Sequence, residues 1–480
     1  MHFASSECLY LLGTTILLIR VLPIQYKTTI LLTSTLVFFF FDSPVNLIFL
    51  SYVVLLSYSI IRINSKNPTT VTPPWLLAFQ LSLVILPLAT YKMIIPHLPG
   101  SYMQSQHRLS YLGAIPLGLS FYTLQAISII VDTRNRAYKN KFTLKDHTLF
   151  LSFFPQLIAG PIERASNLMS QILEFNTTKT KSYRLGLKLI LWGLFKKMVI
   201  ADNLSPIVDN VYGGYQGYSG VFILFATYLF FIQLYADFSG YCDVAKGSAS
   251  LLGLNISNNF DYPLSATNIK TFWRKWHVSL HSWLLDYIYK PIIAQFGTKL
   301  GKVMTVFLVF IVSSLWHAST INFILWGLSN AIIYIIYSTM ISKGVSATNK
   351  NTSIFINALK IFITISVINI TWVFFRAPNI NAAFTIYTKI GQSFLLLDNY
   401  TINPDWVLET INFLKSNSRV FALTVVTIIF IIFEMMSEMK TYLRSNDTVS
   451  YTEIMLWDYV ILSLVVLSMP QSDTFLYFKF

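Results

Sequence analysis

Long apolar runs recur along almost the whole chain and are separated by short polar segments. A helix needs about 20 mainly apolar residues to cross the ~30 Å hydrocarbon core of a bilayer, and several of the runs are shorter than that. We therefore predict an all-α, polytopic integral membrane protein with roughly 10–12 transmembrane helices plus re-entrant or interfacial helices. The runs cover residues 9–19, 29–41, 47–61, 75–91, 112–131, 185–200, 221–236, 303–315, 321–340, 354–375, 419–433 and 456–469.

Composition and charge support a membrane protein. Hydrophobic residues make up 54% of the chain and charged residues 12%, whereas soluble proteins carry about 25% charged residues. The net charge of +14 would favour nucleic acid as a partner of a soluble protein. Here it fits cytosolic loops rich in Lys and Arg, such as residues 131–149. We expect a lipid bilayer as partner and no nucleic acid.

No linker of domain size and no internal repeat interrupts the chain. The simplest organisation is a single membrane domain over residues 1–480, with N-terminal helices at 1–110, a core at 111–380 and C-terminal helices at 381–480. Arg20 follows the first apolar run where a signal peptide would have small residues, so we expect a retained span. Cys8 and Cys242 are the only cysteines and lack metal-ligand spacing. We therefore expect no disulfide framework and no metal site.

The middle third of the chain holds a histidine beside an aromatic stripe. Apolar side chains recur every three or four residues over 269–289, which predicts one amphipathic helix. Its first turns are basic, so we expect the helix to rest at the headgroup level with its aromatic face inward. His277 adjoins Trp273 and Trp276 on that face, whereas His281 reads as a simple polar lining residue.

A second histidine, His317, ends the apolar run that precedes it and is followed by small residues before the next run begins at Ile321. An imidazole at such a break is expected where a helix ends inside the protein. Histidine can take a proton from a hydroxyl and later return one. The alternative is a structural histidine that hydrogen-bonds neighbouring helices. His277 lies 40 residues earlier, so the two can come from different helices and point into one cavity.

Further candidates to line a substrate channel are the residues beside the two histidines and the polar residues within 233–243 (QLYADFSGYCD). Buried carboxylates must be paired or solvated. We favour the structural alternative for Asp237 and Asp243, in which they tie a helix end or an ion pair in place. The channel candidates are Trp273, Arg274, Trp276, Trp316, Asp237, Ser239 and Tyr241.

Pro155 and Pro161 interrupt a hydrophobic segment twice, which predicts irregular backbone at membrane depth. The chain has no GxSxG, HExxH, Walker or GxGxxG motif. No motif therefore favours a hydrolase or a nucleotide-driven transporter. A transporter or channel that uses His277, His317 and Asp237 as pathway residues, without catalysis, remains an alternative.

Taken together, these segments resemble the membrane-bound O-acyltransferase superfamily, and most closely its bacterial branch of alginate O-acetyltransferase type. The resemblance runs from about Pro116 to the end of the chain, and its specificity lies in the order of the pieces. The matching pieces are 116–125 (PLGLSFYTLQ), 153–155 (FFP), 160–162 (GPI), 236–241 (ADFSGY) with Asp243, Asn259 and Phe260 with Pro263, 272–277 (FWRKWH), 286–289 (DYIY) with Pro291, Trp316 with His317, Trp326 with Gly327, 372–377 (WVFFRA) and 477–480 (YFKF).

The resemblance implies a helical core around a central channel in the cell (inner) membrane, at residues 111–380. It implies that His317 is the catalytic base or relay and that His277 is the second functional residue. No tightly bound cofactor is implied; the donor would be acetyl-CoA or another acyl thioester from the cytosol. The acceptor would be an exported polysaccharide such as alginate, or a periplasmic or secreted acetyltransferase partner protein. Tryptophan N–H groups or a second histidine could stabilise the oxyanion of the reaction.

The sequence also departs from this branch. Ala318 stands where Gly usually follows the histidine, Asn330 and Ala331 stand where His-Gly is common, and Leu285 stands where Arg is usual. Lys246 lies in the helix that follows the ADFSGY segment. These changes bear on donor size and partner docking. Within the superfamily, transfer of D-alanine to a teichoic acid from a carrier protein is the alternative to acetyl transfer.

Overall fold

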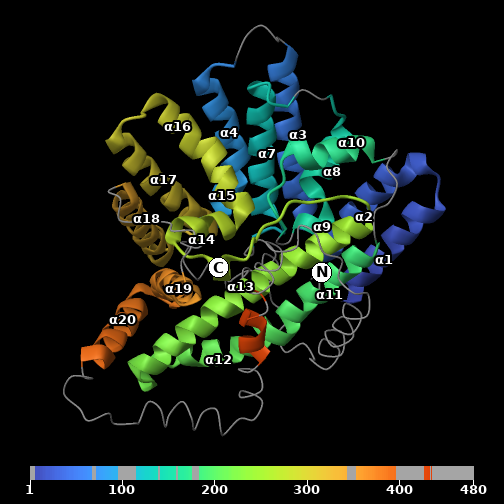
Figure 1. Cartoon of the computed structure of the whole chain (residues 1–480). Helices are drawn as coiled ribbons and strands as arrows, with labels where there is room; N and C mark the ends of the chain where they lie inside the picture. The colour runs from blue at the N-terminus through green and yellow to red at the C-terminus, as the bar shows by residue number, and fades with distance from the viewer. Residues whose placement is uncertain are drawn as a thin grey trace, which may run out of the picture. The chain divides into compact units, whose positions relative to one another are not determined.

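The computed structural model describes residues 6–66, 72–95, 115–138, 141–157, 160–175, 183–342, 353–395, 426–432 and 434, and every regular element in these residues is a helix (Figure 1). The all-α prediction is confirmed. The α-helices are α1 (Ser6–Val21), α2 (Lys27–Asp42), α3 (Pro44–Lys66), α4 (Pro74–Ala89), α7 (Leu119–Arg134), α8 (Leu144–Ser152), α9 (Phe154–Leu157), α10 (Ser170–Glu174), α11 (Tyr183–Leu194), α12 (Asp202–Gly213), α13 (Gly220–Leu251), α14 (Ile269–Lys275), α15 (Val278–Leu284), α16 (Lys290–Gln295), α17 (Lys299–His317), α18 (Ile321–Ser342), α19 (Ile354–Arg376) and α20 (Ile380–Leu395). Short 3-10 helices are η1 (Ile24–Tyr26), η6 (Tyr215–Gly217) and η7 (Pro263–Ser265), and π-helical turns are η2 (Thr90–Ile94), η4 (Ala165–Met169), η5 (Phe195–Ala201) and η8 (Leu285–Tyr289).

Seven helical stretches among the described residues are long and apolar enough to cross a membrane. The protein is therefore a multi-pass membrane protein. The count of roughly 10–12 spans stays a prediction, because the run at 456–469 lies outside the described residues and that at 419–433 is described only over 426–432. The seven stretches are Ile24–Asp42, Pro44–Ser65, Pro74–Ile94, Gly220–Leu251, Lys299–His317, Ile321–Met340 and Phe355–Arg376.

The chain divides into two compact units. The first, here the N-terminal unit, comprises Met1–Gly193 and Tyr241–Asn259, and the second, the C-terminal unit, comprises Leu194–Gly240 and Phe260–Phe480. The division falls within α13, the longest helix of the described part. The prediction of a single domain with a core at 111–380 stays a prediction.

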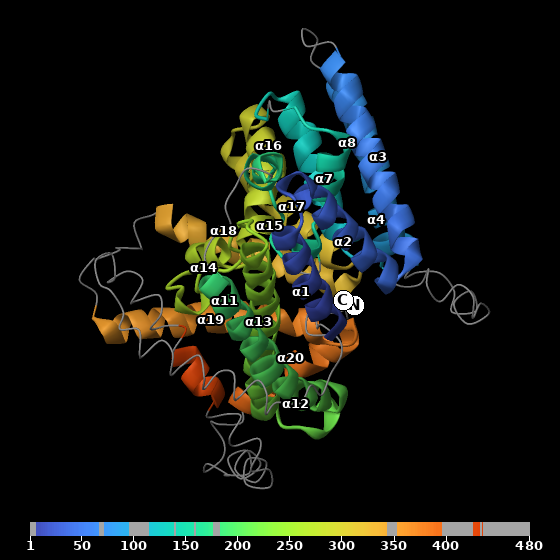
Figure 2. The ribbon, with the colours of Figure 1, turned by 90° about the vertical axis from the view of Figure 1, so that its right-hand side faces the viewer.

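The N-terminal unit is built around α7. Twelve consecutive residues of this helix, Leu119 to Ile130, are buried, so protein covers all of its sides. Helix α3 packs against α7 and runs alongside α4 (Figure 2). At the start of α8, Thr143 and Asp146 form a capping box, and the next residue, His147, lies 2.8 Å from the Ser57 hydroxyl of α3. This histidine is therefore a structural one.

The proline-containing segment of the N-terminal unit is irregular, as predicted. Helix α8 ends at Ser152, the single turn α9 covers Phe154–Leu157, and no regular element is described from Gly160 to Arg164. Both prolines are responsible, because proline lacks the N–H that continues a helix and its ring clashes with the preceding turn.

The C-terminal unit contains a tightly packed pair of helices, α17 and α18, which lie side by side in Figure 1. Gly327 of α18 makes the close approach possible. A Cβ atom at this position would lie 2.7 Å from the Phe310 carbonyl oxygen and would overlap the Ser314 hydroxyl of α17. Because Ser314 lies three residues before His317, this contact fixes the height of the histidine along α17.

The prediction of one continuous amphipathic helix over 269–289 is wrong. Helix α14 ends at Lys275, Trp276 is extended, and α15 begins after His277, which adopts φ +46° and ψ +54°. Left-handed backbone is uncommon for a residue with a Cβ atom, so it turns the chain sharply here. The periodicity misled because both short helices present aromatic side chains at helical spacing on either side of the break.

Candidate functional site

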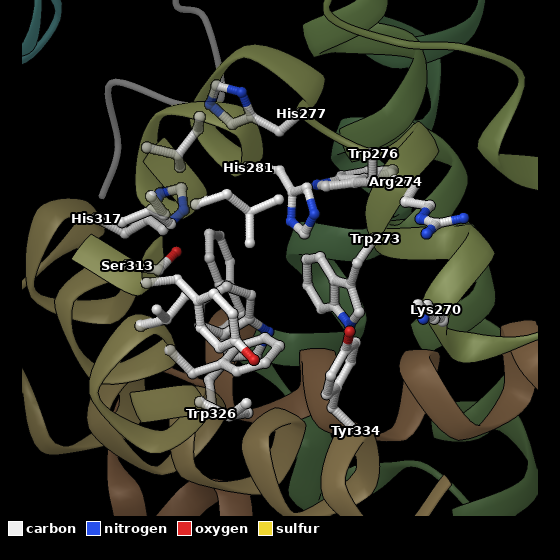
Figure 3. A pocket seen from close by; sticks show the side chains of 18 of the residues that line it. Lys270, Trp273, Arg274, Trp276, His277, His281, Ser313, His317, Trp326 and Tyr334 are labelled. Carbon is white, nitrogen blue, oxygen red and sulfur yellow. The ribbon is translucent and has the colours of Figure 1, made fainter. Parts of the chain in front are cut away.

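A cavity of about 320 Å³ lies inside the C-terminal unit, between α14, α15, α17, α18 and α19 with the adjoining part of α13. Both predicted histidines, His277 and His317, line it, as do three of the predicted channel residues, Trp273, Arg274 and Trp276. Figure 3 shows His317 and Ser313 on one side of the cavity and Trp273, Arg274 and Lys270 on the other. A cavity of this size is adequate for part of a substrate.

His277 owes its position to the left-handed turn between α14 and α15. Its ring is 4% exposed and packs edge-on against Phe238 of α13, with 4.8 Å between ring centroids. Burial, with a smaller contribution from the neighbouring His281, lowers the pKa of His277 to about 3. The imidazole is therefore neutral at pH 7.

His317 is the last residue of α17, so it lies at a helix end inside the protein, as its sequence context predicts. It is 9% exposed and surrounded by aromatic rings. Trp326 of α18 meets the imidazole edge-on at 5.5 Å between centroids, and Phe375 of α19 lies at 5.6 Å. Trp316 contacts both histidine rings, at 5.8 Å from His277 and 5.0 Å from His317.

The cavity wall also carries three tryptophans with unused N–H groups. The indole nitrogens of Trp273, Trp326 and Trp372 are buried and have no hydrogen-bond acceptor among the described residues. Trp326 lies between the other two, with centroids 6.1 Å from Trp273 and 6.0 Å from Trp372. Buried donors in proteins are nearly always paired, so an acceptor that is absent from the described protein residues is expected here.

The charge lining the cavity is positive. Lys270 and Arg274 line its rim and are exposed, and no carboxylate belongs to the described lining residues. His281 also lines the cavity, where burial and the nearby Arg274 lower its pKa to about 4, so it is neutral at pH 7. The net positive charge therefore comes from the two side chains of α14.

The remaining candidates do not line the cavity. Trp316 and Ser239 are buried and directly adjoin lining residues in the sequence, but they do not line the cavity themselves. Tyr241 belongs to the N-terminal unit. Asp237 forms an ion pair of 2.8 Å with Lys197 of η5, whose ammonium also lies 2.7 Å from Asp202. This is the pairing that the structural alternative for Asp237 predicts.

Several lining residues were not among the sequence candidates. They are Lys270, Ser313, Trp326, Tyr334, Trp372 and Phe375. The motifs at 326–327 and 372–377 contain Trp326 and Trp372. The spacing of apolar residues alone does not reveal that α18 and α19 meet His317. Among the described residues no group of three or more His, Cys, Asp or Glu side chains could hold a metal ion.

The comparisons with known proteins agree on one family of acyltransferases. The sequence model of the membrane-bound O-acyltransferase family matches residues 133–376, half of the chain. The chain is 35% identical over 298 residues to peptidoglycan O-acetyltransferase of Helicobacter pylori, covering 57% of this chain and 56% of that protein. It is 33% identical over 273 residues to the probable alginate O-acetylase AlgI of Pseudomonas aeruginosa, covering 57% and 51%.

A more distant relative is teichoic acid D-alanyltransferase of Bacillus subtilis, 30% identical over 243 residues, covering 46% of this chain and 58% of that protein. The matches with these relatives span little more than half of their length. The matched family region, residues 133–376, contains both cavity histidines and all of the cavity-lining residues named above. The chain belongs to the membrane-bound O-acyltransferase family.

Proposed function

We propose that this chain is an O-acyltransferase that moves an acetyl group from a cytosolic thioester donor, such as acetyl-CoA, towards an exported polysaccharide. Transfer to the polysaccharide is direct or proceeds through an extracytoplasmic partner protein. The observation that carries the proposal is that His277 and His317, from separate elements, line one cavity in a chain of this family.

In the proposed reaction His317 is the base. Its imidazole takes the proton of the acceptor hydroxyl while that oxygen attacks the thioester carbonyl carbon, giving a tetrahedral oxyanion. The carbon–sulfur bond then breaks, the carbonyl re-forms, and the thiolate takes the proton from the imidazolium. Atoms and charge balance without a metal or redox group. The aromatic rings around His317 exclude water, which limits hydrolysis of the thioester.

The buried indole N–H groups supply a candidate oxyanion donor. Trp326 is the best placed, because its ring contacts His317 and its N–H has no acceptor among the described residues. An N–H donor aimed at the developing oxygen stabilises the transition state more than the ground state.

Trp326→Phe is therefore expected to lower kcat about 100-fold while leaving KM nearly unchanged, because an aromatic side chain is kept and the N–H donor is lost. Turnover of acetyl-CoA by the purified protein measures both constants. Trp283→Phe is the matched control, because Trp283 is equally buried but does not line the cavity. Equal losses in the two variants would assign Trp326 to packing alone.

His277→Ala is expected to lower acetyl transfer at least tenfold without loss of folding, because the side chain lines the cavity. The backbone conformation needs its own control, since alanine is strained at positive φ. His277→Gly removes the ring without that strain, so both variants are expected to lose activity together. Wild-type turnover in the glycine variant would return His277 to a structural role.

The D-alanyltransferase relative supports a second candidate, transfer of D-alanine to a teichoic acid. The purified chain is assayed in detergent with acetyl-CoA or a D-alanyl thioester of a carrier protein. Acceptors are deacetylated alginate oligomers, peptidoglycan fragments or lipoteichoic acid. We expect thiol release and acetylated product from acetyl-CoA. D-Alanyl transfer alone would support the second candidate, and turnover of neither donor would favour the transporter alternative.

A further inference from the structure

We propose that Lys270 and Arg274 form a phosphate-binding site at the rim of the cavity, which anchors the phosphate-bearing end of the thioester donor. The proposal rests on the proposed acyl transfer, because it names how the donor is held. It adds a specificity site that is separate from the two histidines.

The two cations share one face of α14. They are four residues apart, which places their side chains next to each other on a helix. Figure 3 shows them together beyond Trp273, on the opposite side of the cavity from His317. Both are exposed, so an anion can reach them from outside the cavity.

Neither cation is neutralised by a residue that the structure describes. Among the described residues no hydrogen bond or ion pair is formed by the Lys270 ammonium or the Arg274 guanidinium, and the cavity lining contains no carboxylate. The charge of Arg274 is instead felt by His281, whose pKa it helps to lower. Other basic residues nearby are paired: Lys275 donates to the Ser265 hydroxyl at 3.1 Å, and Lys290 pairs with Asp286 at 2.7 Å.

The shape of the site fits a ligand that is anionic at one end only. Behind the two cations the lining is dominated by Trp273, Trp276, Leu280 and Leu284, and it leads to the histidines. A pantetheine thioester has this form, with a phosphate at one end and an uncharged arm that carries the acyl group at the other. Arginine binds phosphate through paired N–H groups, and lysine adds a point charge.

The test compares donors with and without phosphate on the full-length protein in detergent. Lys270→Gln and Arg274→Gln are each expected to raise KM for acetyl-CoA about tenfold, and the double variant about 100-fold, with kcat unchanged. KM for S-acetylpantetheine, which has no phosphate, is expected to stay the same in all variants. Lys275→Gln is the matched control on the same helix and is expected to leave every constant unchanged.

Two sources of phosphate are distinguished by S-acetyl-4′-phosphopantetheine. If the double variant loses affinity for this donor as well, the site binds the phosphate next to the pantetheine arm, which a carrier protein also supplies. If only acetyl-CoA is affected, the site binds the nucleotide phosphates. An equal KM increase for the phosphate-free donor, no increase for acetyl-CoA, or an increase for an anionic polysaccharide acceptor instead of the donor overturns the proposal.

A binding measurement separates this proposal from the proposed function. Coenzyme A itself is expected to raise the unfolding temperature of the wild-type protein, to do so less at high salt, and to have no effect on the double variant. This result would support the phosphate site even if the chain transferred no acetyl group. Failure of coenzyme A to stabilise the wild type would overturn it.

Discussion

Replacing His317 by alanine is expected to reduce acyl transfer 10²–10⁴-fold, roughly the range that a general base contributes. The imidazole ends α17 inside the cavity and is held by Trp326 and Phe375, so the variant loses the base but keeps the surrounding rings. Thiol release from acetyl-CoA in the presence of acceptor is the measurement. The KM for the donor is expected to change little, because the proposed anchor lies on the other side of the cavity.

The control for this variant is Ile321→Ala at the start of α18. Ile321 is exposed and does not line the cavity, so activity within about twofold of wild type is expected. Both variants should elute as the same detergent-solubilised species as the wild type. Undiminished donor turnover in His317→Ala would contradict the catalytic assignment and leave the histidine as a packing residue.

The features that sequence predicts well here are those set by local chemistry. The break at His317 was predictable because an apolar run ends there and small residues follow, and α17 does end at that residue. The two prolines predicted the irregular segment after α8 for the same reason, since proline acts on its own turn. The pairing of Asp237 was also expected, because an isolated charge is costly at membrane depth.

What the sequence could not predict depends on how distant segments meet. The left-handed backbone at His277 has no local signal such as glycine, so the turn between α14 and α15 was missed. Trp326 and Trp372 become cavity residues only because α18 and α19 pack beside His317, and Gly327 allows the close approach of α18 to α17. The partner of Asp237 was not predictable either, because Lys197 lies 40 residues earlier on η5.

Lys197→Met is expected to lower the free energy of unfolding by about 3–5 kcal/mol, the range measured when one partner of a buried ion pair is removed. The Lys197 side chain is 7% exposed, and its ammonium bridges Asp202 and Asp237, whose side chains are 6% and 1% exposed. Burial alone would lower the pKa of Lys197, but Asp237 and Asp202 outweigh it and raise the pKa. Methionine has a similar length and no charge, so both buried carboxylates would lose the Lys197 ammonium. Denaturant unfolding of the detergent-solubilised protein measures the change.

Two further variants distinguish charge burial from a general effect of losing lysine. Lys290→Met removes the partner of Asp286 from an exposed pair, where the two side chains are 69% and 41% exposed, and a change of no more than about 0.5 kcal/mol is expected. Combining Lys197→Met with Asp202→Asn and Asp237→Asn should recover much of the loss, because the carboxylates that Lys197 neutralises are then uncharged as well. Asp237 directly precedes Phe238, whose ring packs against His277, so the destabilised single variant should also lose acyl transfer. A loss in Lys197→Met no larger than in Lys290→Met would mean that the buried ion pairs do not hold α13 in place.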